Sequence, residues 1–264
     1  MIPEGFVESW GQSKAPWQTL AMVEQDLVIS CALVELFNND IIKNNLIFRG
    51  GTALNKLYLK PPARYSEDLD FVQTRPEPIG LTIDAIRTAL SPWLGEPKRK
   101  QTERGVKLVY RYLSIDNISA RLKIEINTTE HFSVLDLQHI DHTVDSEWFK
   151  GQGTIITYHL EELMATKLRA LYQRRKGRDL FDLWFVCDRN LVDIEQVIAL
   201  FHKYCTHGGL IISKEAFIEN MQLKSTSNDF RIDMDMLLPI EMKWNFDTAF
   251  EFVQEQVISK IQTY

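Results

Sequence analysis

The sequence predicts an α+β protein in which a mixed α/β part, residues 1–155, precedes a mostly helical part, residues 156–264. Two observations predict this organisation. Before about residue 155, short runs of alternating apolar and polar residues, typical of strands, occur between segments with helical periodicity. After that point, apolar residues recur almost throughout at steps of three and four, which is the spacing of amphipathic helices.

Turn-forming residues set the bounds of the elements expected in the first part. The polar residues 38–40 end the first helix, and the prolines within 61–62 and 76–78 interrupt the chain. In chain order we expect a helix over 18–37, a strand at 46–50, a helix over 52–59, a strand at 66–74, a helix over 83–94, and strands at 106–114 and 120–128.

The second part is expected to consist of helices joined by short loops. The segment 159–189 has helical periodicity, with Gly177 as a local break. Further helices are expected over 193–205, 214–223 and 245–264. A second Asp-x-Asp sequence, at Asp233 and Asp235, has a helix-like context in which residues two apart do not face each other, so we assign no metal to it.

The composition is that of a globular protein in a reducing compartment. The chain has 264 residues, of which 45% are hydrophobic, enough to bury a substantial core. Its three cysteines, Cys31, Cys187 and Cys205, are widely separated and lack CxxC spacing. We therefore expect a cytoplasmic protein with neither a disulfide framework nor a zinc site.

Charge and hydropathy exclude further classes of protein. The N-terminal stretch MIPEGFVESWGQ has neither a basic start nor an apolar core, so no signal peptide is expected. No apolar run is long enough to cross a bilayer, so no membrane partner is expected either. The net charge of −6 argues against coating of nucleic acid by the whole surface.

Two glycines and a threonine separate the strand at 46–50 from the following helix. Gly50 and Gly51 let the backbone approach a ligand closely, and Thr52 stands where the helix would begin. The free amides of a first helical turn form an anion site together with such a hydroxyl. The alternative is a plain turn with Thr52 as N-cap, the commoner role of an isolated Gly-Gly-Thr. The spacing is neither Walker nor Rossmann.

Two aspartates in the next strand share one face. Asp68 and Asp70 are two residues apart, while Leu69 points to the opposite side. Two carboxylates on an apolar-backed strand are suited to Mg²⁺ beside a substrate phosphate, although a lone Asp-x-Asp is more often a solvated strand face. Glu125, between two isoleucines, would add a third carboxylate if its strand lay alongside, as a two-metal site requires.

A third charged group lies in KLRALYQRRKGRDLFDL. Lys167 is on a helix, and Asp179 and Asp182, three apart, share a helix face. Four basic residues lie between them: Arg174, Arg175, Lys176 and Arg178. One interpretation is a charged helix surface with local ion pairs. The other gives Lys167 to a triphosphate, the basic residues to a polyanion and Asp179 to orientation.

Taken together, the segments GGTALNK, RYSEDLDF, LKIEI and ELMATKLRALYQRRKGRDLFDL resemble the AbiEii/AbiGii-type nucleotidyltransferase toxins. That family belongs to the DNA polymerase β-like nucleotidyltransferase superfamily. The similarity follows the expected order over about residues 20–190. It implies a polymerase β-like core, a mixed sheet with flanking helices, over residues 1–155, and a helical lobe over 156–264 that completes the active site.

The resemblance also implies roles for individual residues. The catalytic residues would be Asp68, Asp70, Lys167 and Asp179. The nucleotide would be bound by Gly50, Gly51, Thr52, Ser66, Lys167 and Asp182. The metal ligands would be Asp68 and Asp70, with Glu125 as the superfamily's third carboxylate. The acceptor would be bound by Arg174, Arg175, Lys176 and Arg178. The threonine replaces a serine that the superfamily often carries, and its hydroxyl can act in the same way.

Members of this family are toxins of bacterial toxin–antitoxin or phage abortive-infection pairs, and several are similar to enzymes that add nucleotides to the 3′ end of tRNA. The resemblance thus implies a nucleoside triphosphate donor, Mg²⁺ or Mn²⁺ as cofactor, a tRNA acceptor and a cognate antitoxin. Two alternatives stay open: transfer to a protein or to a small molecule, as in aminoglycoside adenylyltransferases, and a catalytically silent binding module. The basic residues favour a polyanionic acceptor, and Asp68 with Asp70 argues against a silent site.

Overall fold

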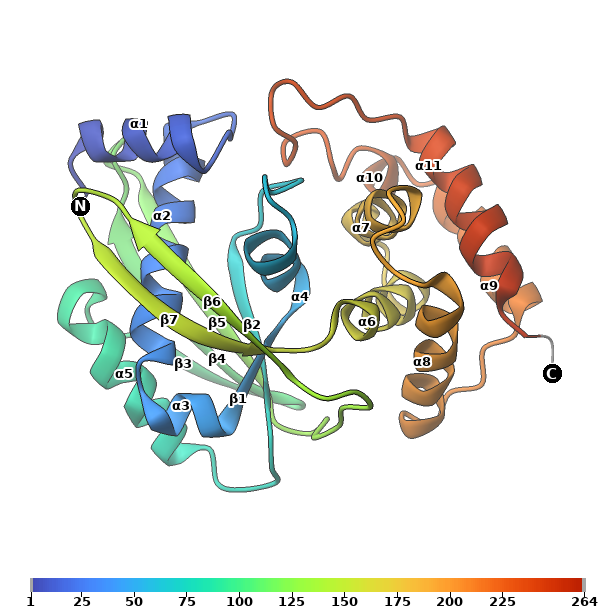
Figure 1. Cartoon of the computed structure of the whole chain (residues 1–264), viewed down its shortest axis with the longest axis horizontal. Coiled ribbons are helices and arrows are strands. Elements are labelled where there is room, and N and C mark those ends of the chain that lie inside the picture. The colour runs from blue at the N-terminus through green and yellow to red at the C-terminus, as the bar shows by residue number, and fades with distance from the viewer. Residues whose placement is uncertain (1, 263–264) are drawn as a thin grey trace. The chain divides into compact units, whose positions relative to one another are not determined.

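The structure is a computed structural model that describes residues 2–262, and the chain divides after Tyr158 into two compact units (Figure 1). The first unit is built around a sheet and the second is helical. The final two residues of the helix expected over 245–264 lie outside the described residues. No helix within residues 2–262 has the length and apolar character needed to cross a membrane.

A mixed seven-stranded sheet forms the centre of the first unit, with the order β3-β4-β5-β2-β1-β7-β6. Its strands are β1 (Leu46–Arg49), β2 (Asp68–Gln73), β3 (Lys98–Thr102), β4 (Gly105–Leu113), β5 (Ser119–Asn127), β6 (Gln138–Asp145) and β7 (Lys150–Thr157). β2 is central: it pairs antiparallel with β1 and parallel with β5. β1 in turn pairs parallel with β7.

Helices cover the apolar face of this sheet. The first unit contains α1 (Glu4–Ser13), α2 (Leu20–Phe37), α3 (Asp40–Asn45), α4 (Gly50–Ala53), which continues as a π-helical turn over Leu54–Tyr58, and α5 (Gly80–Leu94). α2 packs against β5, β6 and β7, and its Phe37 ring lies 6.2 Å from that of Phe71 on β2. Leu69 and Phe71 are therefore buried in this core, and the alternation of the strand directs Asp68 and Asp70 to the other face.

A buried carboxylate ties the N-terminal helix to the rest of the first unit. Asp26 of α2 accepts hydrogen bonds from the indole Nε1 atoms of Trp10 (2.8 Å) and Trp17 (2.9 Å). The ammonium of Lys56 lies 2.6 Å from the same carboxylate. Burying a charge is costly unless it is paired and hydrogen-bonded, and Asp26 meets both conditions. The position of α1 is thus set by a fully partnered acid.

The second unit is a bundle of helices. It comprises α6 (Leu160–Gln173), α7 (Gly177–Asp188), α8 (Ile194–His207), α9 (Lys214–Ser225), α10 (Asn228–Arg231) and α11 (Phe246–Phe252), which continues in helical turns to Lys260. α6 packs against α7, α8 and α9. The rings of Phe181, Trp184 and Trp244 contact one another with centroids 5.2–5.8 Å apart, which joins α7 to the segment before α11.

Several element boundaries differ from those expected. The helix expected from Thr52 begins at Gly50, so that Arg49 is the N-cap. Asp233 and Asp235 lie in turns after the short helix α10 and not in a helix. Six elements were not expected from the sequence: α1, α3, β3, β6, β7 and α10. The helix expected over 159–189 is interrupted at residues 174–176, and Gly177 is the first residue of α7. Glycine is required there because a Cβ would lie 2.3 Å from the carbonyl oxygen of Phe230.

Candidate active site

The two glycines form the turn between β1 and α4, and both are closely approached by side chains. Gly50 has a φ of +83°, a conformation that residues with a Cβ rarely adopt. A Cβ on Gly50 would lie 2.6 Å from Asp70 Oδ2, and one on Gly51 would lie 2.4 Å from Arg64 Nη2. Because neither glycine has a side chain, the turn can lie directly against the carboxylate of Asp70 and the guanidinium of Arg64.

Thr52 is buried and connects this turn to the aspartate strand. Its hydroxyl donates to the backbone carbonyl of Asp68 and lies 2.8 Å from the hydroxyl oxygen of Ser66. Only 1% of the residue's surface is exposed, so the hydroxyl bonds within the protein and does not face solvent. The first backbone amides of α4 have no partner within the helix itself, as at any helix start.

The strand register assembles a row of charged side chains across the sheet. Asp70 lies between Arg49 on β1 and Glu125 on β5. Glu125 is in turn opposite Lys107 on β4. Two residues earlier on β2, Asp68 is opposite Lys123 of β5. The structure thus brings the three predicted carboxylates to one face, interleaved with basic residues that carry no role in the sequence-based prediction.

Lys123 bridges two of these carboxylates. Its ammonium lies 2.6 Å from Asp68 Oδ2 and 2.9 Å from Glu125 Oε1, and Lys107 lies 2.9 Å from the other oxygen of Glu125. Burial acts to raise the pKa of Glu125, but the hydrogen bonds from Lys107 and Lys123 outweigh it and hold that pKa below its usual range. Glu125 is therefore charged, and the ammonium of Lys123 stands between Asp68 and Glu125.

The donor set fits a divalent cation at Asp68 and Asp70. Mg²⁺ prefers oxygen ligands and is commonly held by one or two carboxylates together with substrate phosphates. The ammonium of Lys123 shows that a cation is accommodated beside Asp68. Among residues 2–262, however, no three acidic, histidine or cysteine side chains are grouped so that they could hold an ion. Asp68 and Glu125 are both paired with Lys123, so a metal held by these acids would displace that lysine.

The second unit contains a separate buried ion cluster. The ammonium of Lys167 on α6 lies 3.2 Å from Asp179 Oδ1 and 2.9 Å from Asp182 Oδ2 on α7. Arg174 binds Asp179 with two hydrogen bonds, from Nε at 2.7 Å and from Nη2 at 2.9 Å. Asp179 and Asp182 are 0% and 1% exposed. The three residues predicted here from the sequence therefore meet, and Arg174 adds the second positive charge that balances the two carboxylates.

The predicted acceptor-binding residues are only partly free to bind a polyanion. Arg174 is engaged by Asp179. Arg178 Nε lies 3.4 Å from Asp233, which also accepts from the backbone amide of Arg178, and Lys176 lies 3.9 Å from the same aspartate. Arg175 is exposed. Internal pairing thus orders most of this basic segment, although several of its charges lie at the surface.

The electrostatics of this cluster predict an acid-sensitive second unit. Burial acts to raise the pKa of Asp179, but Lys167 and Arg174 outweigh it and lower that pKa to about 2. A carboxyl whose folded pKa is depressed stabilises the fold above its unfolded value near 4, and this contribution is lost as the pH falls toward 2. The difference corresponds to roughly 2 kcal/mol.

Urea unfolding at pH 7 and pH 3 measures that contribution. We expect the Asp179→Asn variant to lose less free energy of unfolding between the two pH values than the wild type, because it has no carboxyl to protonate. Asp188→Asn, which changes an exposed aspartate on the same helix, should retain the wild-type loss. Equal losses in the Asp179→Asn variant and the wild type would contradict the assignment.

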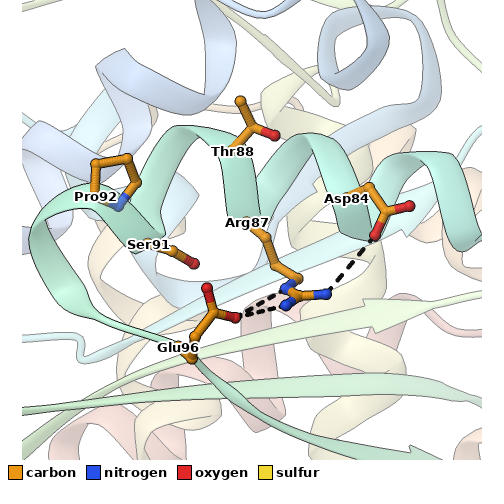
Figure 2. Close-up of a pocket in the computed structure, with 6 residues that line it drawn as sticks. All are labelled: Asp84, Arg87, Thr88, Ser91, Pro92 and Glu96. Carbon is orange, nitrogen blue, oxygen red and sulfur yellow. Dashed lines mark hydrogen bonds and ion pairs between the residues drawn. The ribbon is translucent and has the colours of Figure 1, made fainter.

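A cavity of about 610 Å³ along α5 is not a candidate for the site (Figure 2). Arg87 lies at its centre, with Nε and Nη2 bound to Glu96 at 3.0 and 2.7 Å and Nη1 4.0 Å from Asp84. These are exposed side chains that join α5 to the segment leading into β3, and the guanidinium is already neutralised. Exposed pairs of this kind contribute little beyond local order.

Two residues that shape the site, Asn55 and Lys123, were not predicted from the sequence. The side-chain amide of Asn55 donates to the carbonyl of Gly51 (3.0 Å), and its oxygen accepts from the amides of Ala63 and Arg64. Asn55 therefore fixes the glycine turn to the loop before Asp68. Lys123 carried a usable signal, because it lies two residues before Glu125 and so shares its strand face. Asn55 carried none, because its role depends on the path of the loop.

Solved structures of other proteins are similar to this chain over most of its length. The nucleotidyltransferase toxin MenT4 (Rv2826c) of Mycobacterium tuberculosis H37Rv has a TM-score of 0.62 at 15% identity, covering 99% of this chain and 91% of MenT4. JHP933 of Helicobacter pylori has a TM-score of 0.55 at 18% identity, covering 90% of this chain and 94% of that protein.

A putative nucleotidyltransferase of H. pylori has a TM-score of 0.54 at 18% identity, with 92% of this chain and 98% of that one covered. At sequence identities of 15–18%, these structural similarities establish the fold. No curated protein is detectably similar to the chain in sequence. The family model described as nucleotidyl transferase AbiEii toxin of type IV toxin–antitoxin systems matches residues 31–252, and the chain therefore belongs to the AbiEii family of nucleotidyltransferase toxins.

Proposed function

We propose that this nucleotidyltransferase toxin transfers a nucleoside monophosphate from a nucleoside triphosphate to the 3′ end of tRNA, with Mg²⁺ as cofactor. One observation carries the proposal: Asp68 and Asp70 share a half-buried face of β2, against the glycine turn. Carboxylates beside the first backbone amides of a helix suit a metal-bound triphosphate, since carboxylates bind cations and such amides bind phosphate oxygens. Family membership already implies a nucleoside triphosphate and an antitoxin partner.

In the proposed reaction the acceptor hydroxyl attacks the α-phosphorus of the triphosphate. A new phosphorus–oxygen bond forms to the acceptor, the bond between the α-phosphorus and the bridging oxygen breaks, pyrophosphate leaves, and the hydroxyl proton passes to solvent. Asp68 and Asp70 would hold the metal, with Glu125 as third ligand once its lysine partners are displaced. When bound, the ion neutralises the triphosphate and lowers the pKa of the attacking hydroxyl.

The remaining roles fall to other side chains and to the backbone. The amides of Gly50, Gly51 and Thr52 would bind phosphate oxygens, with Ser66 beside them, so that the triphosphate is held before reaction. In the second unit, Lys167 would neutralise phosphate charge by exchanging one of its ion pairs, and Asp179 and Asp182 would orient its ammonium. The acceptor's backbone would be bound by Arg174, Arg175, Lys176 and Arg178. Such contacts position a nucleic acid without reading its sequence.

Incubation of the purified chain with total tRNA, Mg²⁺ and each labelled nucleoside triphosphate separately tests the proposal. We expect label from one nucleotide to enter RNA on a gel, and Asp68→Ala to remove that signal. Removing the metal with a chelator should also abolish the labelled RNA signal. Label that enters a protein band, or an added small molecule, and not RNA would contradict the acceptor assignment, whereas no transfer under any condition would contradict the mechanism.

A further inference from the structure

We call the face of the sheet that carries Asp68 and Asp70 the aspartate face. It continues from β2 across β5 and β4 to the edge strand β3. Residues directly opposite each other in neighbouring strands lie on the same face. Lys100 of β3 is opposite Lys107 of β4, which belongs to the charged row described above. Lys98, two residues before Lys100, shares its side of the strand, so both lysines lie on the aspartate face.

Two arginines lie on the same face, directly opposite each other. Arg111 of β4 is opposite Arg121 of β5, and Arg121 is two residues before Lys123, whose side of the strand it shares. Both arginines are exposed, and within residues 2–262 no carboxylate lies within ion-pair distance of either, including that of nearby Glu67. Like charges directly opposite in a sheet are destabilising. The stability of the fold therefore does not explain this pair.

On strands β2 to β5, basic side chains outnumber acidic ones on the aspartate face. The acids there are Asp68, Asp70 and Glu125. Two lysines, Lys107 and Lys123, form ion pairs with these acids. The other basic residues of the face are exposed and form no ion pair within the described part of the chain. We call these four residues the basic surface: Lys98, Lys100, Arg111 and Arg121.

Protection of the sheet edge accounts for only part of the basic surface. Charged residues on an edge strand hinder pairing with other chains, and Lys98 and Lys100 of β3 are suited to that purpose. Arg111 and Arg121 lie on β4 and β5, which have a neighbouring strand on each side. No edge is exposed there for them to protect. Their charge therefore indicates an anionic partner.

The extent of the basic surface suits a chain of phosphates and not a single anion. Arg121 is one strand and two residues from Asp68, and Lys98 is three strands from it. At the usual spacings within a sheet, these separations are about 8 and 14 Å between Cα positions. A nucleotide bound at the aspartates would not extend over this surface, whereas a nucleic-acid backbone with its end at Asp68 would.

We propose that the basic surface binds the sugar–phosphate backbone of the RNA acceptor and leads its 3′ end to Asp68 and Asp70. This inference rests on the proposed function in taking RNA as the partner. The arginines and lysines donate charge-assisted hydrogen bonds to phosphate oxygens. Such contacts hold the RNA in position without reading its sequence. They add acceptor contacts on the first unit to those assigned above to the second.

Filter binding of labelled total tRNA to the full chain, in KCl and EDTA and without nucleotide, tests this proposal separately from transfer. We expect Arg111→Gln/Arg121→Gln to bind tRNA at least about tenfold more weakly than the wild type, because two phosphate contacts are lost. The dependence of log K on log[KCl] should become shallower by about 1.5–2. The urea midpoint of this variant should not fall below that of the wild type, because the substitution removes a repulsion.

Two controls are matched to these changes. Lys14→Gln/Lys60→Gln removes two exposed positive charges that lie near β6, at the opposite edge of the sheet, and should bind tRNA within about twofold of the wild type. On β3 itself, Lys100→Gln should weaken binding by about threefold. Arg99→Gln, which changes the adjacent exposed residue on the opposite face, should leave binding unchanged.

Equal tRNA affinities of the wild type and Arg111→Gln/Arg121→Gln would overturn the proposal, as would equal losses in the arginine variant and the Lys14→Gln/Lys60→Gln control. Either result is expected if the surface serves an acidic protein or the donor triphosphate instead. Absence of tRNA binding by the wild type would also overturn it. If label still enters RNA in that case, this inference alone fails. Arginine-dependent tRNA binding without label transfer would support this surface and contradict the proposed function.

Discussion

Asp70→Asn is expected to lower nucleotidyl transfer by roughly 10²- to 10³-fold, the usual loss when one group that stabilises transition-state charge is removed. Asparagine keeps the shape of aspartate, so it should fit between Arg49 and Glu125 and against Gly50. What it loses is the negative charge required for a metal ligand. The measurement is the initial rate of label transfer at saturating nucleotide and Mg²⁺.

Glu67→Gln provides the matched control for Asp70→Asn. Glu67 is exposed, lies three residues earlier in the same segment, and undergoes the same change of charge and shape. Its rate should stay near that of the wild type, and the free energy of unfolding of both variants should stay within about 1 kcal/mol of the wild-type value. A rate for Asp70→Asn within tenfold of the wild type would exclude Asp70 as a metal ligand.

Lys167→Met is expected to have the largest effect on stability, about 3–5 kcal/mol, as well as to lower transfer. Methionine can occupy the space of the lysine stem, but it removes the ammonium shared by Asp179 and Asp182. Both carboxylates are almost fully buried, and removing one partner of a buried ion pair leaves charge without compensation. Urea unfolding at pH 7, followed by circular dichroism, measures the effect.

Lys203→Met is the control for this change, because Lys203 is exposed on α8 of the same unit. Its free energy of unfolding should change by less than about 0.5 kcal/mol. Transfer by Lys167→Met should be assayed well below its unfolding midpoint, so that the loss of rate reports the folded variant. A stability equal to that of the wild type would mean that the cluster does not hold α6 to α7.

The sequence was informative wherever local spacing determines geometry. The two-residue repeat placed Asp68 and Asp70 on one face of β2, and the three-residue spacing placed Asp179 and Asp182 together on α7. Neighbours from distant segments could not be deduced in this way. Glu125 lies beside Asp70 because β5 pairs parallel with β2, and Lys167 reaches Asp179 because α6 packs on α7.

The omitted strands have sequences that do not show a strand pattern. β3 reads KRKQT and lies at one edge of the sheet, where solvent accepts charged side chains on both faces. β6 lies at the other edge, and β7 begins with two glycines in four residues. Edge strands are commonly charged, which prevents pairing with other chains but also removes the alternation used to recognise a strand.

The chain passes from one unit to the other once, between Tyr158 and His159. A single crossing means that a gene could be cut at this codon and its halves encoded separately, each specifying a contiguous unit with a core of its own. Each half would then carry one of the two groups of charged side chains: the aspartate face in the first, and the cluster of Lys167, Asp179 and Asp182 in the second.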